Sequence, residues 1–256
     1  MEKKMILLIM AAGKSTRFNG YPKAFCSLGK EINVNNTIEK SSKYVEKVYV
    51  GINKETFEYT NQFDVRGELI SIVTGQGDAD SIYKCVIEIK RRNPEYHRDL
   101  LICWGDAVFF EEVPFKYATN DDEMDENYFI SAVCSWDKKP YAWFDYDNTG
   151  ITKVHFYNDS SEVVEYGMHD QSLFRTNIDI IYEYLKIYRE KNGLTDKNIN
   201  IYNPNIKEIK LLEMMAFYHN LNEYKNAGIL QIPSGSVMSF NSVEELENIK
   251  KCLREG

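Results

Sequence analysis

The sequence feature that most constrains the fold is a short apolar run at residues 5–10, which stops abruptly at three small residues. These small residues are Ala11, Ala12 and Gly13. The pattern predicts a buried strand followed by a turn. Basic residues follow the turn, namely Lys14, Arg17 and Lys23. Backbone N–H groups in such a turn bind polyphosphates together with basic side chains. The segment therefore predicts a nucleoside triphosphate (NTP) site.

Two other interpretations of this segment are less favourable. A P-loop needs a glycine five residues before its Gly-Lys pair, but Leu8 stands at that position, so we exclude it. A secretory signal peptide is compatible with the basic start and the short apolar run. That interpretation places the cleaved stretch directly against the basic motif and makes the motif a coincidence, so we disfavour it.

Composition excludes several classes of function. The net charge of −8 and the pI of about 5.2 disfavour a broad nucleic-acid surface, so a basic site must be local. No apolar run approaches the roughly 20 residues of a membrane span. The five cysteines are odd in number and widely spaced, which indicates neither a disulfide framework nor a zinc site. We therefore expect a cytoplasmic protein without a membrane or nucleic-acid partner.

The order of predicted elements indicates an α/β fold. Strands are predicted at 5–10, 47–51, 68–73 and 100–104, with helices near 37–44 and at 80–92 between them, and this alternation predicts a mostly parallel sheet with helices on both faces. The second half is predicted to add strands at 128–135 and 229–232, a β-hairpin at 141–156, and helices at 177–190, 208–218 and 244–253. We expect one domain over 1–256, with a nucleotide-binding half at about 1–120 and an acceptor-binding half at about 121–256.

The opening motif also carries a family resemblance. The string from Ala11 to Arg17, followed by Pro22-Lys23, resembles the first motif of the GT-A-like, MobA-like or sugar-phosphate type nucleotidyltransferases. This group includes sugar-1-phosphate nucleotidylyltransferases and the cytidylyltransferases of methylerythritol phosphate and phosphocholine. The resemblance implies a Rossmann-like three-layer α/β/α fold with the hairpin over the acceptor site. It also implies Mg²⁺-dependent transfer of NMP from an NTP to a small phosphorylated acceptor, with release of pyrophosphate.

The resemblance assigns the residues of the opening motif. The phosphates would be neutralised by three catalytic residues, Lys14, Arg17 and Lys23. The nucleotide would lie against Ala11, Ala12, Gly13 and Ser15. Because the acceptor phosphate is already a nucleophilic anion, we look for oxygen ligands of Mg²⁺ rather than for a catalytic histidine.

Two positions are candidates for the Mg²⁺ ligands. Asp106 directly follows the predicted strand 100–104 and Gly105, and this string is similar to the family strand whose Asp holds the metal. Asn241 occupies the position where the closing segment of the family supplies a second ligand. The alternative is that Asn241 or Ser242 caps the last helix, with Glu245 completing a capping box.

The base and acceptor sites carry softer signals. Gln76, Asp80 and Ser81 are candidates for base recognition, since an amide matches the edge of a pyrimidine. The Asp80-Ser81 stretch looks like that of the methylerythritol-phosphate cytidylyltransferases, whereas Gln76 is closer to the uridylyltransferase pattern; a polar loop that caps a helix is the alternative. Arg175 is the candidate for binding the acceptor phosphate, with a surface arginine before a helix as the alternative.

Departures from the family pattern favour CTP as the nucleotide. Ser15 and Asn241 replace commoner residues, and the gap between Arg17 and Pro22 is short, which disfavours a sugar-1-phosphate uridylyl- or thymidylyltransferase. A glycosyltransferase of the same fold would want an Asp-x-Asp motif after the fourth strand. A nucleotide sensor without turnover is the non-enzyme alternative. Neither the acceptor nor the oligomeric state follows from the sequence.

Overall fold

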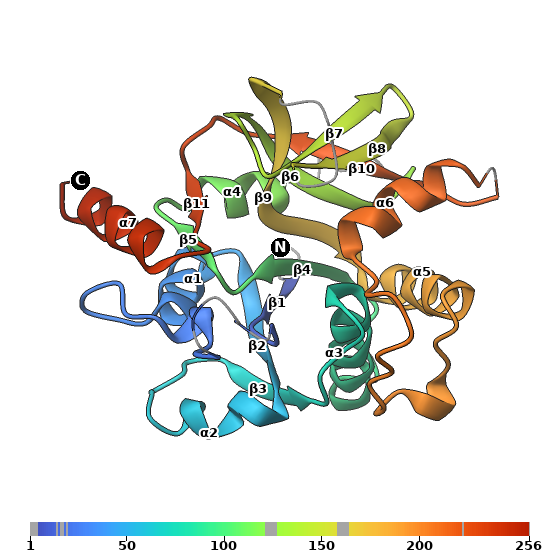
Figure 1. The fold of residues 1–256 in the computed structure, drawn as a ribbon, viewed down its shortest axis with the longest axis horizontal. Helices are drawn as coiled ribbons and strands as arrows, with labels where there is room; N and C mark the ends of the chain where they lie inside the picture. Colours follow the sequence, from blue (N-terminus) through green and yellow to red (C-terminus); the bar gives the residue numbers. More distant parts are fainter. Residues whose placement is uncertain are drawn as a thin grey trace.

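The computed structural model describes residues 5–13, 15, 18, 20–120, 127–157, 164–221 and 223–255. Its centre is a seven-stranded sheet with the order β10-β6-β9-β4-β1-β2-β3 (Figure 1). The bounds are β1 Met5–Met10, β2 Val45–Asn53, β3 Glu68–Ile72, β4 Asp99–Trp104, β6 Tyr128–Lys138, β9 Tyr166–Asn177 and β10 Asn226–Gln231. Only β9 runs antiparallel to its neighbours among these strands. The expected mostly parallel sheet is confirmed.

Helices cover both faces of this sheet, and β1 shows why. Its even-numbered residues, such as Leu8, join the core with α3 Asp78–Arg92, α5 Ile178–Lys191 and α6 Leu211–His219. Its odd-numbered residues, such as Leu7, join the core with α1 Asn33–Ser41 and α4 Val113–Ala118. A strand buried on both faces reads as a continuous apolar run. The three-layer α/β/α prediction is therefore confirmed.

The second half of the chain also builds the predicted hairpin. Strands β7 Ala142–Asp147 and β8 Gly150–Phe156 pair antiparallel, and the hairpin packs against β9, β10 and α6. Gly150 has a φ of +124°, and a Cβ there would lie 2.3 Å from the carbonyl oxygen of Ala227. The turn therefore needs glycine both for its backbone conformation and for its close approach to β10.

The remaining elements are short, apart from the last helix. They are α2 Phe57–Thr60, β5 Ala107–Phe109, β11 Val237–Ser239 and the 3-10 turns Lys23–Phe25, Lys54–Thr56 and Asp196–Asn198. Strand β11 pairs antiparallel with β5. Helix α7 Val243–Glu255 lies at one edge of the molecule (Figure 1) and packs through Leu246 and Ile249 onto Phe18 and Phe240. None of the described helices is long and apolar enough to cross a membrane.

Several elements differ from the sequence-based prediction; helix α1, for example, spans Asn33–Ser41 rather than residues 37–44. Strand β9, which joins β4 to β6, was not predicted, because polar residues such as Arg175 interrupt its apolar pattern. Helix α6 begins at Leu211 rather than at residue 208. Ile209 instead donates to the Gln76 carbonyl oxygen and accepts from the Ala79 N–H of α3, and Lys210 has an extended backbone, so the helix starts only after them.

Candidate active site

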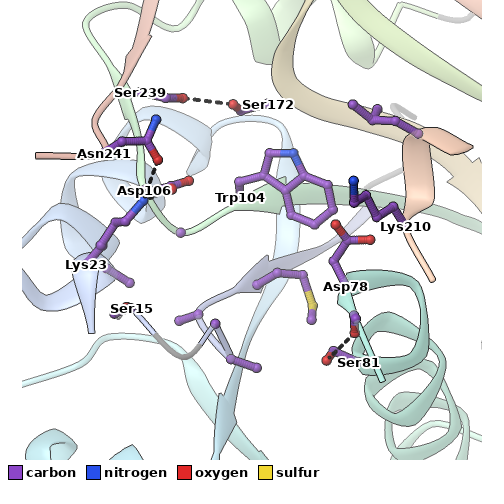
Figure 2. A pocket seen from close by; sticks show the side chains of 18 of the residues that line it. Ser15, Lys23, Asp78, Ser81, Trp104, Asp106, Ser172, Lys210, Ser239 and Asn241 are labelled. Atoms are coloured by element: carbon purple, nitrogen blue, oxygen red, sulfur yellow. Dashed lines mark hydrogen bonds and ion pairs between the residues drawn. The ribbon is translucent and has the colours of Figure 1, made fainter. Parts of the chain in front are cut away.

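A cavity of about 680 Å³ opens beyond the carboxyl ends of β1 and β4. Figure 2 shows side chains converging on it from both halves of the chain. Eight of the residues predicted from the sequence line it: Ala11, Ala12, Gly13, Ser15, Lys23, Ser81, Asp106 and Asn241. Ligands of open α/β sheets bind at this edge. The cavity is therefore the candidate active site.

The floor of the cavity is built by the end of β1. Here the Gly105 N–H donates to the carbonyl oxygen of Met10 at 2.9 Å, which ties β4 to β1. Ser15 has a φ of +47°, the left-handed region that non-glycine residues rarely adopt. A Cβ on Gly13 would meet no described atom within 4 Å. The backbone at Gly13 is thus open to the cavity, as a phosphate-binding turn requires. Lys14 and Arg17, the other predicted phosphate ligands, lie outside the described residues.

Lys23 joins the two predicted metal ligands. Its ammonium donates to Asp106 Oδ2 at 2.7 Å and to Asn241 Oδ1 at 3.0 Å. It also donates to the backbone carbonyl oxygen of Phe240 at 3.0 Å. Asp106 and Asn241, which lie 83 and 218 positions from Lys23 in the sequence, therefore meet at its ammonium (Figure 2, upper left).

The capping alternative for Asn241 is resolved by its neighbours. The Glu245 N–H donates to Ser242 Oγ, while Glu245 Oε2 accepts from the backbone N–H groups of Ser242 and Asn241. Ser242 and Glu245 thus form the capping box of α7. Because the cap uses the backbone of Asn241 but not its side chain, the amide oxygen of Asn241 is left to face Lys23.

The donor set at this point fits a divalent cation. Asp106 contributes a carboxylate oxygen, Asn241 an amide oxygen and Phe240 a carbonyl oxygen, all directed at the positive charge of Lys23. Hard oxygen atoms of these types are the ligands of Mg²⁺, which usually takes few from the protein and the rest from phosphates and water. A cation already lies where these oxygens converge, so the geometry accommodates positive charge.

The opposite end of the cavity is formed by the N-terminal turn of α3. Ser81 donates its hydroxyl to the Gly77 carbonyl oxygen at 2.9 Å, and Asp78 lies at the wall between Ser81 and Lys210 (Figure 2). Burial raises the pKa of Asp78 to about 6, against the opposing effects of the Leu211 and Ala79 N–H groups and of Lys210. At neutral pH this carboxyl group is therefore mostly ionised and accepts hydrogen bonds.

Gln76 does not face the cavity, which corrects its predicted role. The side chain donates to the Ile206 carbonyl oxygen at 2.5 Å and accepts from the Asn203 N–H at 3.1 Å. Its backbone carbonyl accepts from the Ile209 N–H. Because both ends of the amide are used by residues 203–206, Gln76 ties this segment to the loop before α3 rather than reading a base.

Asp80 is also turned away from the cavity, which corrects its predicted role in nucleotide binding. Its carboxylate accepts from Arg189 Nε at 2.6 Å, from Lys84 Nζ at 3.1 Å and from the Gln76 N–H at 2.8 Å. The side chains of Asp80, Lys84 and Arg189 are almost fully buried. Asp80 therefore neutralises two buried cations and leaves the cavity wall to Asp78 and Ser81.

Arg175 has a structural role instead of the predicted acceptor-binding one. It lies in β9, is only 2% exposed and does not line the cavity. Its guanidinium bonds to Asp99 Oδ2 at 2.7 Å and to the carbonyl oxygens of Ala118 and Asn120. Residues this far apart in sequence leave no local signal, so the pairing was not predictable.

Several cavity residues were not predicted from the sequence as ligand-binding residues. Trp104 ends β4, and its ring packs edge-on against Phe174 at 5.4 Å while lining the cavity. Lys210, from the segment before α6, lies across from Trp104 (Figure 2). The wall is completed by Tyr141 and Phe156 at the open end of the hairpin, and by His169, Asp170 and Ser172 of β9. Since β9 was not predicted as a strand, nothing in the sequence placed its residues at the site.

Hydrogen bonds fix the orientation of this wall. His169 Nδ1 lies 2.8 Å from the Ala142 carbonyl oxygen. A carbonyl only accepts, so Nδ1 is the donor of this bond. The hydroxyl groups of Ser172 and Ser239 lie 3.0 Å apart (Figure 2). Ser172 has a φ of +58°, at a point where the pairing of β9 with β6 changes register.

Comparisons with known proteins bear on the family and the fold of the chain. The family model of the MobA-like NTP transferase domain matches residues 7–134. A search of the curated proteins finds no match to the chain. Among solved structures, an inositol-1-phosphate CTP transferase from T. maritima superposes with a TM-score of 0.69 at 14% identity, covering 100% of this chain and 99% of that one.

Two further solved structures share the fold. A putative glucose-1-phosphate thymidylyltransferase from Bacillus anthracis, in complex with a sucrose, superposes with a TM-score of 0.71 at 12% identity, covering 98% of this chain and 96% of that one. A nucleoside-diphosphate-sugar pyrophosphorylase from Vibrio cholerae RC9 superposes with a TM-score of 0.67 at 13% identity, covering 96% and 100%. At these identities the likeness establishes the fold, which is that of the GT-A-like nucleotidyltransferases.

Proposed function

The chain belongs to the MobA-like NTP transferase family, and from this premise we propose that it transfers CMP from CTP to a small phosphorylated acceptor. In this reaction an oxygen of the acceptor phosphate attacks the α-phosphorus of the NTP. The bond from the α-phosphorus to the bridging oxygen of the β-phosphate breaks, and pyrophosphate leaves with the electron pair. The product is the nucleoside joined to the acceptor through a diphosphate, one phosphate of which comes from the NTP and one from the acceptor.

The observation that supports this proposal best is the convergence of cradle, cation and oxygen ligands in one cavity. The Ala11–Gly13 backbone and Ser15 would hold the phosphates, with Lys23 and the predicted Lys14 and Arg17 neutralising their charge. Transfer of this kind depends on position and charge rather than on proton transfer. A magnesium ion held by Asp106 and Asn241 would supply further neutralisation of the phosphates, in keeping with the metal dependence typical of the family.

CTP is favoured by the end of the cavity at the N-terminal turn of α3, where we place the base. Asp78 is mostly ionised at neutral pH and stands beside Ser81 at the N-terminal turn of α3. A carboxylate accepts a hydrogen bond from the exocyclic amino group of cytosine, whereas uracil and thymine present a carbonyl at that position. The T. maritima relative in fold is described as a CTP transferase, which agrees with this preference. Uridylyl or thymidylyl transfer is the alternative.

The acceptor is proposed to lie between the hairpin and β9. Lys210 replaces Arg175 as the candidate for its phosphate, because Lys210 lines the cavity and Arg175 does not. His169, Asp170 and Ser172 would then contact the rest of the acceptor. The division of labour follows the chain, with residues 1–120 binding the nucleotide and residues 121–256 contributing most of the acceptor site.

Pyrophosphate release tests the proposal directly. Each NTP is incubated separately with Mg²⁺ and with pools of sugar, polyol and amino-alcohol phosphates. We expect release with CTP and one acceptor pool, and none without an acceptor. Release with UTP or dTTP only would favour the alternative base. Silence with every NTP and pool, with nucleotide binding retained, would instead favour a sensor or an acceptor outside the pools.

A further inference from the structure

The ammonium of Lys23 has no hydrogen-bonding capacity left for a substrate. A lysine ammonium carries three donors, and here they are directed at Asp106 Oδ2, Asn241 Oδ1 and the Phe240 carbonyl oxygen. The rings of Phe18 and Phe240 lie 6.0 Å from the same nitrogen, which adds attraction for a cation. In this position all three N–H donors of Lys23 are used by protein oxygens.

The same three oxygens are those that fit a divalent ion. The oxygens of Asp106 and Asn241 cannot bind the Lys23 ammonium and a divalent ion at the same time. An ammonium and a metal ion held by the same oxygens would repel each other. A phosphate, however, attracts lysine as strongly as a carboxylate does. Lys23 borders the cradle at Ala11–Gly13, so phosphates bound there come within its reach.

We propose that Lys23 and the divalent ion compete for Asp106, Asn241 and Phe240, so that the ion binds well only after nucleotide phosphates have drawn Lys23 away. This inference rests on the proposed function. It makes Lys23 a positioning residue for the metal site as well as a phosphate ligand. Metal and nucleotide then bind with positive coupling, and each raises the affinity of the other by the same factor.

Binding of Mn²⁺, followed by its electron paramagnetic resonance signal, tests the competition without turnover. The variant Lys23→Met keeps the length of the side chain but loses the ammonium, and Lys23→Gln is a second variant in case the first folds poorly. Without nucleotide, we expect either variant to bind Mn²⁺ about tenfold or more tightly than the wild type, since a charge-assisted bond no longer has to be broken. Addition of α,β-methylene CTP should tighten Mn²⁺ binding strongly in the wild type and much less in the variants.

A matched control separates competition from simple loss of charge. Lys250 lies on α7 and carries the same charge as Lys23, but its ammonium bonds Glu247 at 2.7 Å. The variant Lys250→Met should therefore bind Mn²⁺ like the wild type. Asp106→Asn combined with Lys23→Met should abolish the gain, because the carboxylate ligand is gone.

The outcomes separate this inference from the proposed function. If Lys23→Met and Lys23→Gln bind Mn²⁺ no more tightly than the wild type without nucleotide, the competition is overturned while the transferase proposal stands. If the wild type binds Mn²⁺ neither with nor without nucleotide and releases no pyrophosphate, the metal-dependent function itself fails. A gain of equal size in Lys250→Met would also overturn the competition, because charge alone would explain it.

Discussion

Substitution of Asp80 can distinguish a structural role of its carboxylate from the nucleotide-binding role that the sequence predicted. It neutralises Arg189 and Lys84, whose side chains are 1% and 6% exposed, and it accepts the N–H of Gln76. The substitution Asp80→Asn keeps the shape of the side chain and removes its charge. Arg189 and Lys84 then no longer share a carboxylate, and the Gln76 N–H in the loop before α3 loses its charged acceptor.

The expected loss of stability follows from these contacts. Removing one partner of a buried ion pair costs about 3–5 kcal/mol. Arg189 keeps a second carboxylate, because its Nη1 bonds Asp196 at 3.1 Å, and it stacks 4.2 Å from the ring of Tyr83. Lys84 keeps the carbonyl oxygens of Val73 and Thr74. We therefore expect the lower end of the range, about 3 kcal/mol in the free energy of unfolding.

Urea denaturation measures this loss through the midpoint and the slope. The double variant Asp80→Asn with Arg189→Met should be less destabilised than the sum of the single variants by about 2 kcal/mol, since the unpaired cation is removed with its partner. Asp179→Asn is the matched control: its pair with Lys90 is partly exposed, so the loss should stay under about 1 kcal/mol. The reasoning is refuted if Asp80→Asn unfolds like the wild type but no longer binds CTP.

Three further predictions concern the cavity. Lys23→Ala and Asp106→Ala should each lose most of the turnover while circular dichroism and urea midpoints show a folded chain. The control Lys43→Ala, at an exposed pair with Glu112, should keep its turnover. Near-normal turnover in Lys23→Ala or Asp106→Ala contradicts the role assigned to that residue. Asn241→Asp should tighten Mn²⁺ binding about tenfold in the presence of nucleotide, because a divalent ion gains more from an added carboxylate than a lysine does; unchanged or weaker binding removes Asn241 from the metal site. Asp78, with its pKa raised to about 6, becomes protonated as the pH falls through that value, so the ratio of kcat/KM for CTP over UTP should fall between about pH 7.5 and about pH 5.5. In Asp78→Asn the ratio should be small at both pH values, and a ratio that does not change with pH in the wild type removes Asp78 from base recognition.

The part of the site that could be predicted from the sequence consists of residues marked by local patterns at the ends of helices and strands. The apolar run before Ala11, the Asp that follows β4 and the closing segment at Asn241 each occupy the end of an element. The ends of parallel strands meet at one edge, so residues placed there are expected to converge even when they are far apart in the chain. Asp106, at the end of β4, follows this rule, whereas Asn241 follows β11, which pairs antiparallel with β5 outside the central sheet, and reaches Lys23 from there.

Other parts of the site depend on contacts that no local pattern reveals. Gln76 and Arg175 are polar residues whose types suit ligand binding, but each is used by partners more than 50 positions away in sequence. The His169–Ser172 wall depends on β9, where buried polar residues hide the alternation of a strand. Lys210 is one of several charged residues before α6, and it is brought to the cavity by hydrogen bonds of its neighbours Ile209 and Leu211 to Gln76, Asp78 and Ala79.

The central claim is tested most directly by following the α-phosphorus of the nucleotide. Purified protein is incubated with Mg²⁺, an acceptor pool that supports pyrophosphate release, and CTP labelled with ³²P at the α-position. Our account predicts that the label leaves CTP only in a product that also contains the acceptor, in equal amount to the pyrophosphate formed. Label that appears as free CMP or CDP, or that stays in CTP while the acceptor is consumed, would contradict it.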